Sequence, residues 1–218
     1  MSTSVAIGVI DYGMGNRRSV EKALEHVGAR AVLTSEHGAL EAADALVLPG
    51  VGAFPQGMAN LRAAGLDELI RRRVGAGTPL LGICLGMQLL FDSSVELAPA
   101  TGLGLIAGEV TPLHSGGLPV PHIGWNEVRL ERACELTPTL EARELPFYHV
   151  HSYAARPSRH EDVVATTEYG ERFATIVARG SVYGVQFHPE KSSRDGLRLL
   201  SRFAELASAR QHQPAAAA

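Results

Sequence analysis

A short apolar run that leads into a glycine-flanked cysteine constrains the fold of this chain more than any other feature. Leu80–Ile83 has the length and composition of a buried strand, and a helical pattern that includes Met87 follows it. Gly82 and Gly86 lie two residues before and two residues after Cys84. A sharp strand-to-helix turn brings these glycine positions together, so a Cβ at either would clash. The spacing therefore predicts a nucleophile elbow at the carboxyl edge of a parallel sheet.

The rest of the first half alternates between short apolar runs and stretches with helical spacing. The predicted strands are Val5–Ile10, Ala31–Thr34 and Ala45–Leu48, and the predicted helices are Arg17–His26 and Gln56–Leu69, the second broken near Gly65. Continuous apolar runs of this length are typical of strands that are buried on both faces. The alternation therefore predicts an α/β fold whose mostly parallel central sheet has helices on both faces.

The second half has shorter strands separated by proline and glycine. The predicted strands are Leu105–Leu113, Asn126–Leu130, Phe147–His151, Val163–Thr167, Ala174–Ala178 and Val182–His188. Their close spacing and frequent turn residues favour antiparallel strands added to the sheet. An amphipathic helix over Gly196–Ala207 closes the fold. We expect residues 1–210 to form a single domain and the polar, alanine-rich residues 211–218 to be disordered.

Composition excludes several classes of function. The chain has 218 residues, 45% of them hydrophobic, and a formal net charge of −3, which favours a globular protein without a nucleic-acid or membrane partner. Its most apolar window, Pro79–Phe91, is shorter than the roughly 18 residues of a membrane span, and its first residues lack the basic segment of a signal peptide. Cys84 and Cys134 differ in context and predict free thiols in a reducing compartment. We therefore expect a cytoplasmic protein.

Cys84 is the strongest candidate for a catalytic residue. The helix predicted after it directs its N-terminus towards the sulfur, which favours the thiolate. A cysteine in an apolar strand is more often structural, which is how we interpret Cys134, but the paired glycines favour a nucleophile. His188 ends a predicted strand, and Glu190, two residues further on, lies on the same side of an extended chain. The three residues predict a Cys–His–Glu triad of nucleophile, base and orienting carboxylate.

Glycines at the end of a neighbouring strand offer a third part of such a site. In Pro49–Gly52, backbone N–H groups can turn inwards to stabilise an oxyanion, and the N–H of Leu85 is the natural second donor. A glycine-rich turn without catalytic function is the alternative. Two other motifs are weak, because Arg18 replaces the third glycine of a dinucleotide-binding loop and the pair His149 and His151 lacks a third metal ligand. We expect neither a cofactor nor a metal.

Several segments resemble one known family. Leu80–Gln88 and His188–Glu190 resemble the signature of class I glutamine amidotransferases. The segments that narrow the resemblance are Asp11–Asn16, Leu48–Phe54, Pro121–Asn126, Val150–Tyr153 and Gly184–Ser193. In combination they resemble the glutaminase subunits of imidazole glycerol phosphate synthase, an enzyme of histidine biosynthesis.

This resemblance implies a three-layer, flavodoxin-like fold and a defined set of roles. Cys84 would attack the side-chain amide of glutamine to form a thioester, His188 would act as acid and base, and Glu190 would orient His188. The other residues with roles implied by the family are Val51, Gly52 and Leu85 in the oxyanion hole, and Gln88, Glu96, His151 and Ser152 around the bound glutamine.

The family also implies a partner. Ammonia would pass to a separate (β/α)8-barrel cyclase, which makes imidazole glycerol phosphate and aminoimidazole carboxamide ribonucleotide, and the two subunits would form a heterodimer. One domain of this length leaves no room for such a synthase, which also favours a docked partner. The residues that match interface positions are Asn16, Trp125 and Lys191. Two departures, Arg17 for an aliphatic residue and His149 for an aromatic one, lie outside the triad and bear on coupling to the partner.

Two alternatives remain open. A glutaminase subunit of another synthase, such as one forming anthranilate or pyridoxal phosphate, would share the triad, but the segments His122–Asn126 and Glu190–Ser193 argue against it. A catalytically idle, partner-binding subunit would keep the elbow only as a fold element. The presence of Cys84 together with His188 and Glu190 argues against that.

Overall fold

The central sheet combines a parallel half with an antiparallel half. The computed structural model describes residues 4–138, 140 and 144–211. The strands of this sheet are β1 (Ala6–Ile10), β2 (Arg30–Thr34), β3 (Ala45–Leu48), β4 (Leu80–Ile83), β8 (His122–Leu130), β9 (Glu144–His151), β11 (Val163–Glu168), β12 (Arg172–Arg179) and β13 (Val182–Val185). Their order is β2-β1-β3-β4-β13-β12-β11-β8-β9. The pairs from β2 to β13 are parallel and the remaining pairs are antiparallel.

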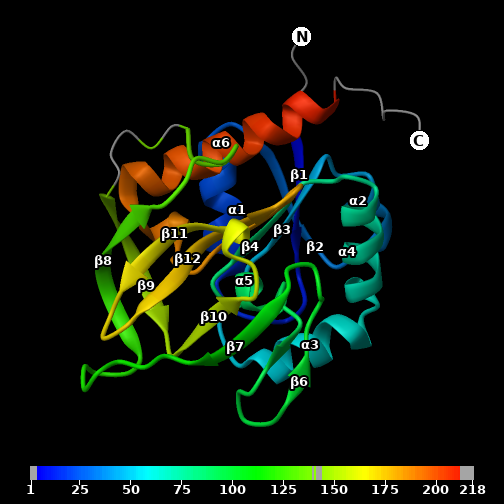
Figure 1. The fold of residues 1–218 in the computed structure, drawn as a ribbon. Helices are drawn as coiled ribbons and strands as arrows, with labels where there is room; N and C mark the ends of the chain where they lie inside the picture. The colour runs from blue at the N-terminus through cyan, green and yellow to red at the C-terminus, as the bar shows by residue number, and fades with distance from the viewer. Residues whose placement is uncertain (1–3, 139, 141–143, 212–218) are drawn as a thin grey trace.

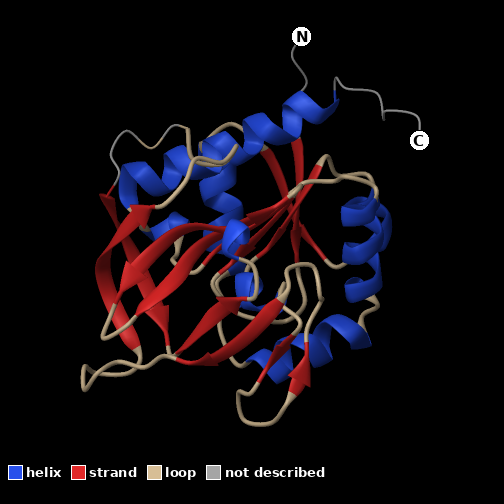
Figure 2. Ribbon diagram, viewed as in Figure 1, coloured by secondary structure: helices blue, strands red, loops and turns tan. Residues whose placement is uncertain are grey.

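Helices cover both faces of the sheet (Figure 1). They are α1 (Arg17–His26), α2 (His37–Glu41), α3 (Phe54–Ala63), α4 (Leu66–Gly75), α5 (Leu85–Leu89) and α6 (Ser193–Gln211). On one face, Leu24 of α1 and Phe203 of α6 share a hydrophobic cluster with Val47. On the other face, helices α2 to α5 pack in a second cluster that contains Leu48. Figure 2 shows the resulting three layers, with the strands between two groups of helices.

Alternate residues of the central strands therefore point into different halves of the core. Every residue of β3 and β4 is buried, and neighbouring residues such as Val47 and Leu48 belong to opposite clusters. A strand buried on both faces has no position for a polar residue, which explains the continuous apolar runs. The predicted α/β class, with helices on both faces of the sheet and added antiparallel strands, is confirmed.

A smaller sheet and one helix break complete the fold. The strands of the smaller sheet are β5 (Ser93–Ser94), β6 (Ala100–Thr101), β7 (Gly108–Pro112) and β10 (Tyr153–Pro157), in the order β10-β7-β5-β6. Of these only β7 is predicted, as part of a longer strand, because two-residue strands leave no periodic pattern. The predicted helix break occurs at Gly65, whose φ of +65° is left-handed and separates α3 from α4.

Gln211, the first residue of the tail that we expect to be disordered, is the last residue of α6, and residues 212–218 lie outside the described residues. Across the described ranges, no helix is both long enough and apolar enough to cross a membrane.

Candidate active site

Cys84 lies at the elbow that the sequence predicts. It connects β4 to α5 with φ +54° and ψ −110°, a strained conformation for a residue with a side chain. A Cβ on Gly82 would lie 2.7 Å from the carbonyl oxygen of Gly86, and a Cβ on Gly86 would lie 1.7 Å from that of Leu48. Both positions therefore require glycine, and the close approach that they permit directs the cysteine to the carboxyl edge of the sheet.

His188 and Glu190 reach the same edge from the adjacent strand. β13 pairs with β4 in parallel, with Val185 opposite Ile83, and the 3-10 helix η2 (Pro189–Lys191) starts just beyond His188. Nδ1 of His188 donates to Oε1 of Glu190 across 2.8 Å, and both side chains are buried. The other ring nitrogen, Nε2, is buried without a partner of standard hydrogen-bond geometry among the described residues, and the ring interacts with Cys84, which raises its pKa. The predicted triad residues are thus brought together.

The surroundings of His188 determine its charge. Burial lowers the pKa of the imidazole, but the hydrogen bonds to Cys84 and Glu190 and the negative charges of both groups outweigh this effect. Together they raise the pKa from 6.5 to about 10. At neutral pH the ring is therefore an imidazolium beside the sulfur, an arrangement that stabilises a nucleophilic thiolate.

Asn16 contacts this pair directly, although the family resemblance places it at the partner interface. Its backbone is left-handed, with φ +67° just before α1, a conformation that asparagine tolerates better than most residues. Its Nδ2 donates to Oε1 of Glu190 and lies 3.4 Å from Nδ1 of His188. Asn16 thus holds the triad carboxylate from a second side, which the sequence analysis missed.

A cavity of about 210 Å³ opens beside Cys84. The predicted oxyanion and glutamine-binding residues all line it, namely Val51, Gly52, Leu85, Gln88, Glu96, His151 and Ser152. Its size and polar lining suit a small polar molecule. Two larger cavities, of about 350 and 340 Å³, have no cysteine among their described lining residues.

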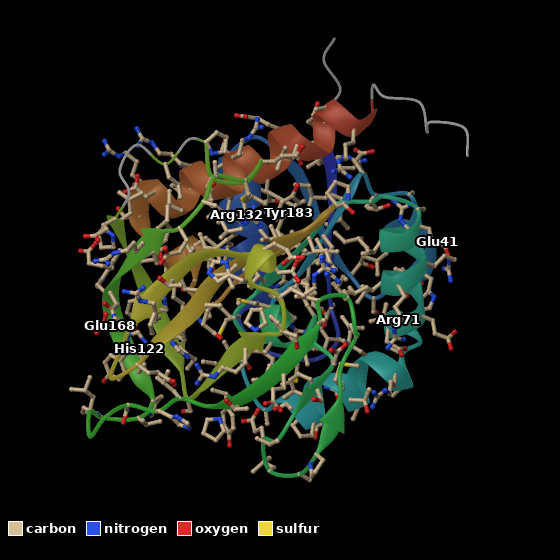
Figure 3. The ribbon with its side chains drawn as sticks, in the orientation of Figure 1. Glu41, Arg71, His122, Arg132, Glu168 and Tyr183 are labelled. Atoms are coloured by element: carbon tan, nitrogen blue, oxygen red, sulfur yellow. The ribbon has the colours of Figure 1, made fainter. Side chains whose placement is uncertain are left out.

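His151 forms part of the cavity wall with both ring nitrogens already bonded. Its Nδ1 lies 2.9 Å from the carbonyl oxygen of Tyr153, and because a carbonyl only accepts, Nδ1 carries the proton. Nε2 therefore accepts from Nδ1 of His122 across 3.0 Å, and Nε2 of His122 accepts from Nδ2 of Asn126 across 3.2 Å. The second amide proton of Asn126 goes to the main-chain carbonyl of Glu168 across 2.9 Å, and Figure 3 labels Glu168 and His122 at neighbouring positions. The ring of His151 shapes the cavity but has no free nitrogen for a ligand.

The three linked imidazoles of His122, His149 and His151 are uncharged at neutral pH. Burial lowers the pKa of His122 and of His151 to about 4. His149 is also buried and lies 5.0 Å from His122, ring centre to ring centre. Its Nδ1 donates to the carbonyl of Phe147 and its Nε2 accepts from the hydroxyl of Thr175, each across 3.0 Å. Burial, followed by the neighbouring imidazoles, lowers its pKa well below 6.5. In the described part of the chain, no group of three residues is placed to hold a metal ion.

The backbone N–H of Leu85, a predicted oxyanion donor, is occupied. It donates to the carbonyl oxygen of Gly50 across 3.3 Å. The oxyanion hole is therefore not formed in this conformation, although Val51 and Gly52 line the same cavity.

Trp125 and Lys191 lie on one exposed face. Trp125 is 55% exposed and its ring meets Tyr148 edge-on, with 6.2 Å between ring centres. Nζ of Lys191 lies 5.9 Å from the centre of the same Tyr148 ring. Arg17, which departs from the family pattern, forms an ion pair with Asp11. The predicted interface residues other than Asn16 are thus available at the surface.

Comparisons with known proteins agree with this geometry. The family model for class I glutamine amidotransferases matches residues 8–206. The imidazole glycerol phosphate synthase subunit HisH of Moorella thermoacetica is 50% identical over 92% of this chain and 94% of its own length. HisH of Bacillus velezensis is 47% identical over 94% of this chain and 98% of its own. A crystal structure of a glutamine amidotransferase aligns with a TM-score of 0.73 at 25% identity, over 92% of this chain and 98% of its own. The chain therefore belongs to the class I glutamine amidotransferases, and within them to the family of HisH subunits.

Proposed function

We propose that this protein hydrolyses glutamine to glutamate and ammonia and delivers the ammonia to a cyclase subunit of imidazole glycerol phosphate synthase. The observation that carries the proposal is the position of Cys84, at an elbow beside a small polar cavity and next to the buried pair of His188 and Glu190. Residues 1–210 would act as one glutaminase domain in the cytoplasm.

The geometry supports a two-step reaction. In the first step the sulfur of Cys84 bonds to the amide carbon of glutamine, the C–N bond breaks, and His188 gives its proton to the leaving ammonia. In the second step the neutral ring removes a proton from water, whose oxygen bonds to the thioester carbon as the C–S bond breaks. Glutamate leaves and the proton on His188 is restored. Glu190 holds the ring in position throughout.

A docked partner follows from the chemistry of the product. Ammonia released into water at neutral pH becomes ammonium, which is not a nucleophile, so a synthase must receive it directly. Exposed apolar side chains occur at the cavity and beside Trp125: Val51 lines the cavity, and Ile123 lies two residues before Trp125 on β8. A patch of this kind on a protein surface is typical of a binding site for another protein. We assign it to the (β/α)8-barrel cyclase, with which the chain would form a heterodimer.

The decisive experiment is copurification with a candidate cyclase, followed by measurement of glutamate release with and without the cyclase ligand. Cys84→Ala should abolish glutamine-dependent synthesis and leave synthesis from added ammonium salts intact, because ammonia then reaches the cyclase without the glutaminase. Glutamine-dependent synthesis by Cys84→Ala would overturn the nucleophile assignment.

The same experiment separates the alternatives. Stimulation by the partner subunit of another synthase, and not by the cyclase, would favour a different ammonia-using enzyme. Binding to the cyclase without any glutamate release would favour an idle subunit. The complete triad beside an open cavity argues against an idle subunit.

A further inference from the structure

We propose that Gln186 is an additional catalytic residue, whose side-chain amide donates to the sulfur of Cys84 and stabilises the thiolate. Gln186 follows β13 directly and is 0% exposed. Its Nε2 lies 3.8 Å from Sγ of Cys84, within reach of a hydrogen bond to sulfur. The proposal rests on Cys84 as nucleophile, and gives this buried amide a role that the triad and the oxyanion hole do not cover.

The orientation of this amide is determined by its neighbours. Nε2 of Gln88 lies 3.1 Å from the carbonyl oxygen of Tyr153 and 3.1 Å from Oε1 of Gln186. A main-chain carbonyl can only accept, so the NH2 group of Gln88 must face it, and its second proton is directed to Gln186. The oxygen of Gln186 is thereby fixed towards Gln88, and its NH2 group is fixed towards Cys84. Reversing either amide would bring two acceptors face to face.

The backbone of Gln186 is fixed as well. Its N–H donates to the carbonyl oxygen of Thr175 on β12 across 2.9 Å. The backbone of Gln186 is thus held by β12 and its side-chain oxygen is held by Gln88, so the amide has little freedom to turn away from the sulfur. A donor held in place before the reaction stabilises a charge without reorganising during it.

The other neighbours of the sulfur show why this donor matters. The carbonyl oxygen of Val150 lies 3.6 Å from Sγ, and it can accept a proton from the thiol but offers none to the thiolate. The titratable groups near Cys84 in the described residues are His188 and Tyr12, which interact with it electrostatically, and Glu96, His151 and Tyr153, which line the same cavity. His188 must give its proton to the leaving ammonia during turnover. Gln186 keeps its protons, so it stabilises the sulfur whenever the sulfur carries charge, including when the thioester breaks.

The test is the pH profile of Cys84 alkylation by iodoacetamide, followed by mass spectrometry of the Cys84 peptide, with Cys134 as internal reference. The profile is measured on the purified chain and on its complex with the cyclase, without glutamine. Gln186→Met removes the donor at similar length, and Gln186→Glu keeps the shape and the acceptor for Gln88. Thr175→Val is the matched control, because it changes a buried polar residue on the adjacent strand whose hydroxyl bonds to His149 and not to the sulfur.

For Gln186→Met we expect the midpoint of the profile to rise by about one pH unit, and labelling at pH values well below the parent midpoint to fall about tenfold. Gln186→Glu should shift further in the same direction, because a carboxylate would face the thiolate. The plateau rate at high pH should not fall in either variant, since the thiolate that forms there remains accessible. Thr175→Val should keep the parent midpoint.

Three results would overturn the proposal. The first is a parent-like midpoint in both Gln186 variants. The second is an equal shift in Thr175→Val, and the third is a lower plateau at an unchanged midpoint, which indicates displacement of the sulfur. None of these depends on glutamine turnover. Absence of cyclase-stimulated glutaminase activity in the parent would instead contradict the proposed function. The alkylation profile would still test the contact between Gln186 and Cys84.

Discussion

The backbone N–H of Leu85 donates to the carbonyl oxygen of Gly50 across 3.3 Å, so the donor next to the nucleophile is bound within the protein. A tetrahedral intermediate on Cys84 develops an oxyanion that needs such a donor free. The triad is assembled in this conformation and the oxyanion hole is not. The segment around Gly50 must therefore move before the chemistry can proceed at full rate.

The first prediction concerns activation by the partner. The isolated protein should release little glutamate, and the complex with a ligand-bound cyclase should release far more, because one oxyanion donor is worth about 100-fold to 1,000-fold in kcat. Steady-state glutamate release, with and without the cyclase, measures this effect. Equal turnover of the isolated and complexed protein would show that the bond between Leu85 and Gly50 does not limit the reaction.

The second prediction concerns Gly50→Ala. A Cβ at this position would lie 2.2 Å from the hydroxyl oxygen of Tyr12, a side chain that is itself buried. Overpacking of this kind costs about 1–3 kcal/mol, so urea unfolding should show a free energy of unfolding lower by that amount. A loss below 0.5 kcal/mol, which is about the usual effect of a surface substitution, would show that the backbone around Gly50 moves to accommodate the added Cβ without cost.

Tyr12→Phe provides the matched test of this contact. The Tyr12 hydroxyl has no hydrogen-bond partner in the ranges that the structure describes, and its burial raises its pKa far above 10. Removing an unpaired buried hydroxyl should therefore cost no stability. In the double variant the nearest ring carbon would lie 3.3 Å from the new Cβ, so most of the loss caused by Gly50→Ala should be recovered. Additive losses in the double variant would contradict the steric explanation.

The third prediction concerns Asn16. Its amide donates to the triad carboxylate Glu190, and a hydrogen bond to a charged group is worth about 1.5–3 kcal/mol. Asn16→Ala should therefore lower kcat of the stimulated enzyme about tenfold or more with little change in KM, and Asn16→Asp should lower it further by repulsion between carboxylates. Arg18→Ala, at an exposed position on α1, is the control. If Asn16→Ala instead raised the Kd for the cyclase without any loss of kcat, Asn16 would be an interface residue only.

The parallel half of the fold and the triad can be predicted from the sequence because their signals are local. Leu80–Ile83 is a buried strand of four residues in the structure as in the prediction. Gly82 and Gly86 indicate the close approach at the elbow, because a Cβ at either position would clash with the backbone. The small sheet has no comparable signal, because β5 and β6 are two residues long and β10 has no alternation of polar and apolar residues.

The contacts that the sequence analysis missed join residues far apart in the chain. His122 meets His151 because β8 and β9 pair in a register that places them opposite each other, and no local pattern determines that register. Asn16 reaches Glu190 across a separation of 174 residues. Gln186 lies within the recognised segment Gly184–Ser193, but only the positions of Gln88 and Tyr153 determine where its amide points.

The fourth prediction concerns pH. His122 and His151 have pKa values lowered to about 4 in the folded state, while an unfolded chain takes up these protons below about 6.5. The unfolded state therefore binds more protons between pH 4 and 6.5, and stability falls as the pH is lowered through that window. His188, with its pKa raised to about 10, acts in the opposite sense, since its contribution is complete below about 6.5 and is lost as the pH rises towards 10. Urea unfolding at a series of pH values should show maximum stability near neutrality.

His149→Phe tests the contribution of a third buried histidine to this pH dependence. His149 is buried and its pKa lies well below 6.5, first through burial and then through His151 and His122, so the neutral ring is retained on acidification while the unfolded chain binds a proton. Each such proton contributes a slope of up to about 1.4 kcal/mol per pH unit to the free energy of unfolding. With phenylalanine in its place, the slope on acidification below about pH 6.5 should decrease by up to one proton, even if the lost bond to Thr175 lowers stability at every pH. A slope that His149→Phe leaves unchanged would mean that the imidazole accepts its proton inside the folded core.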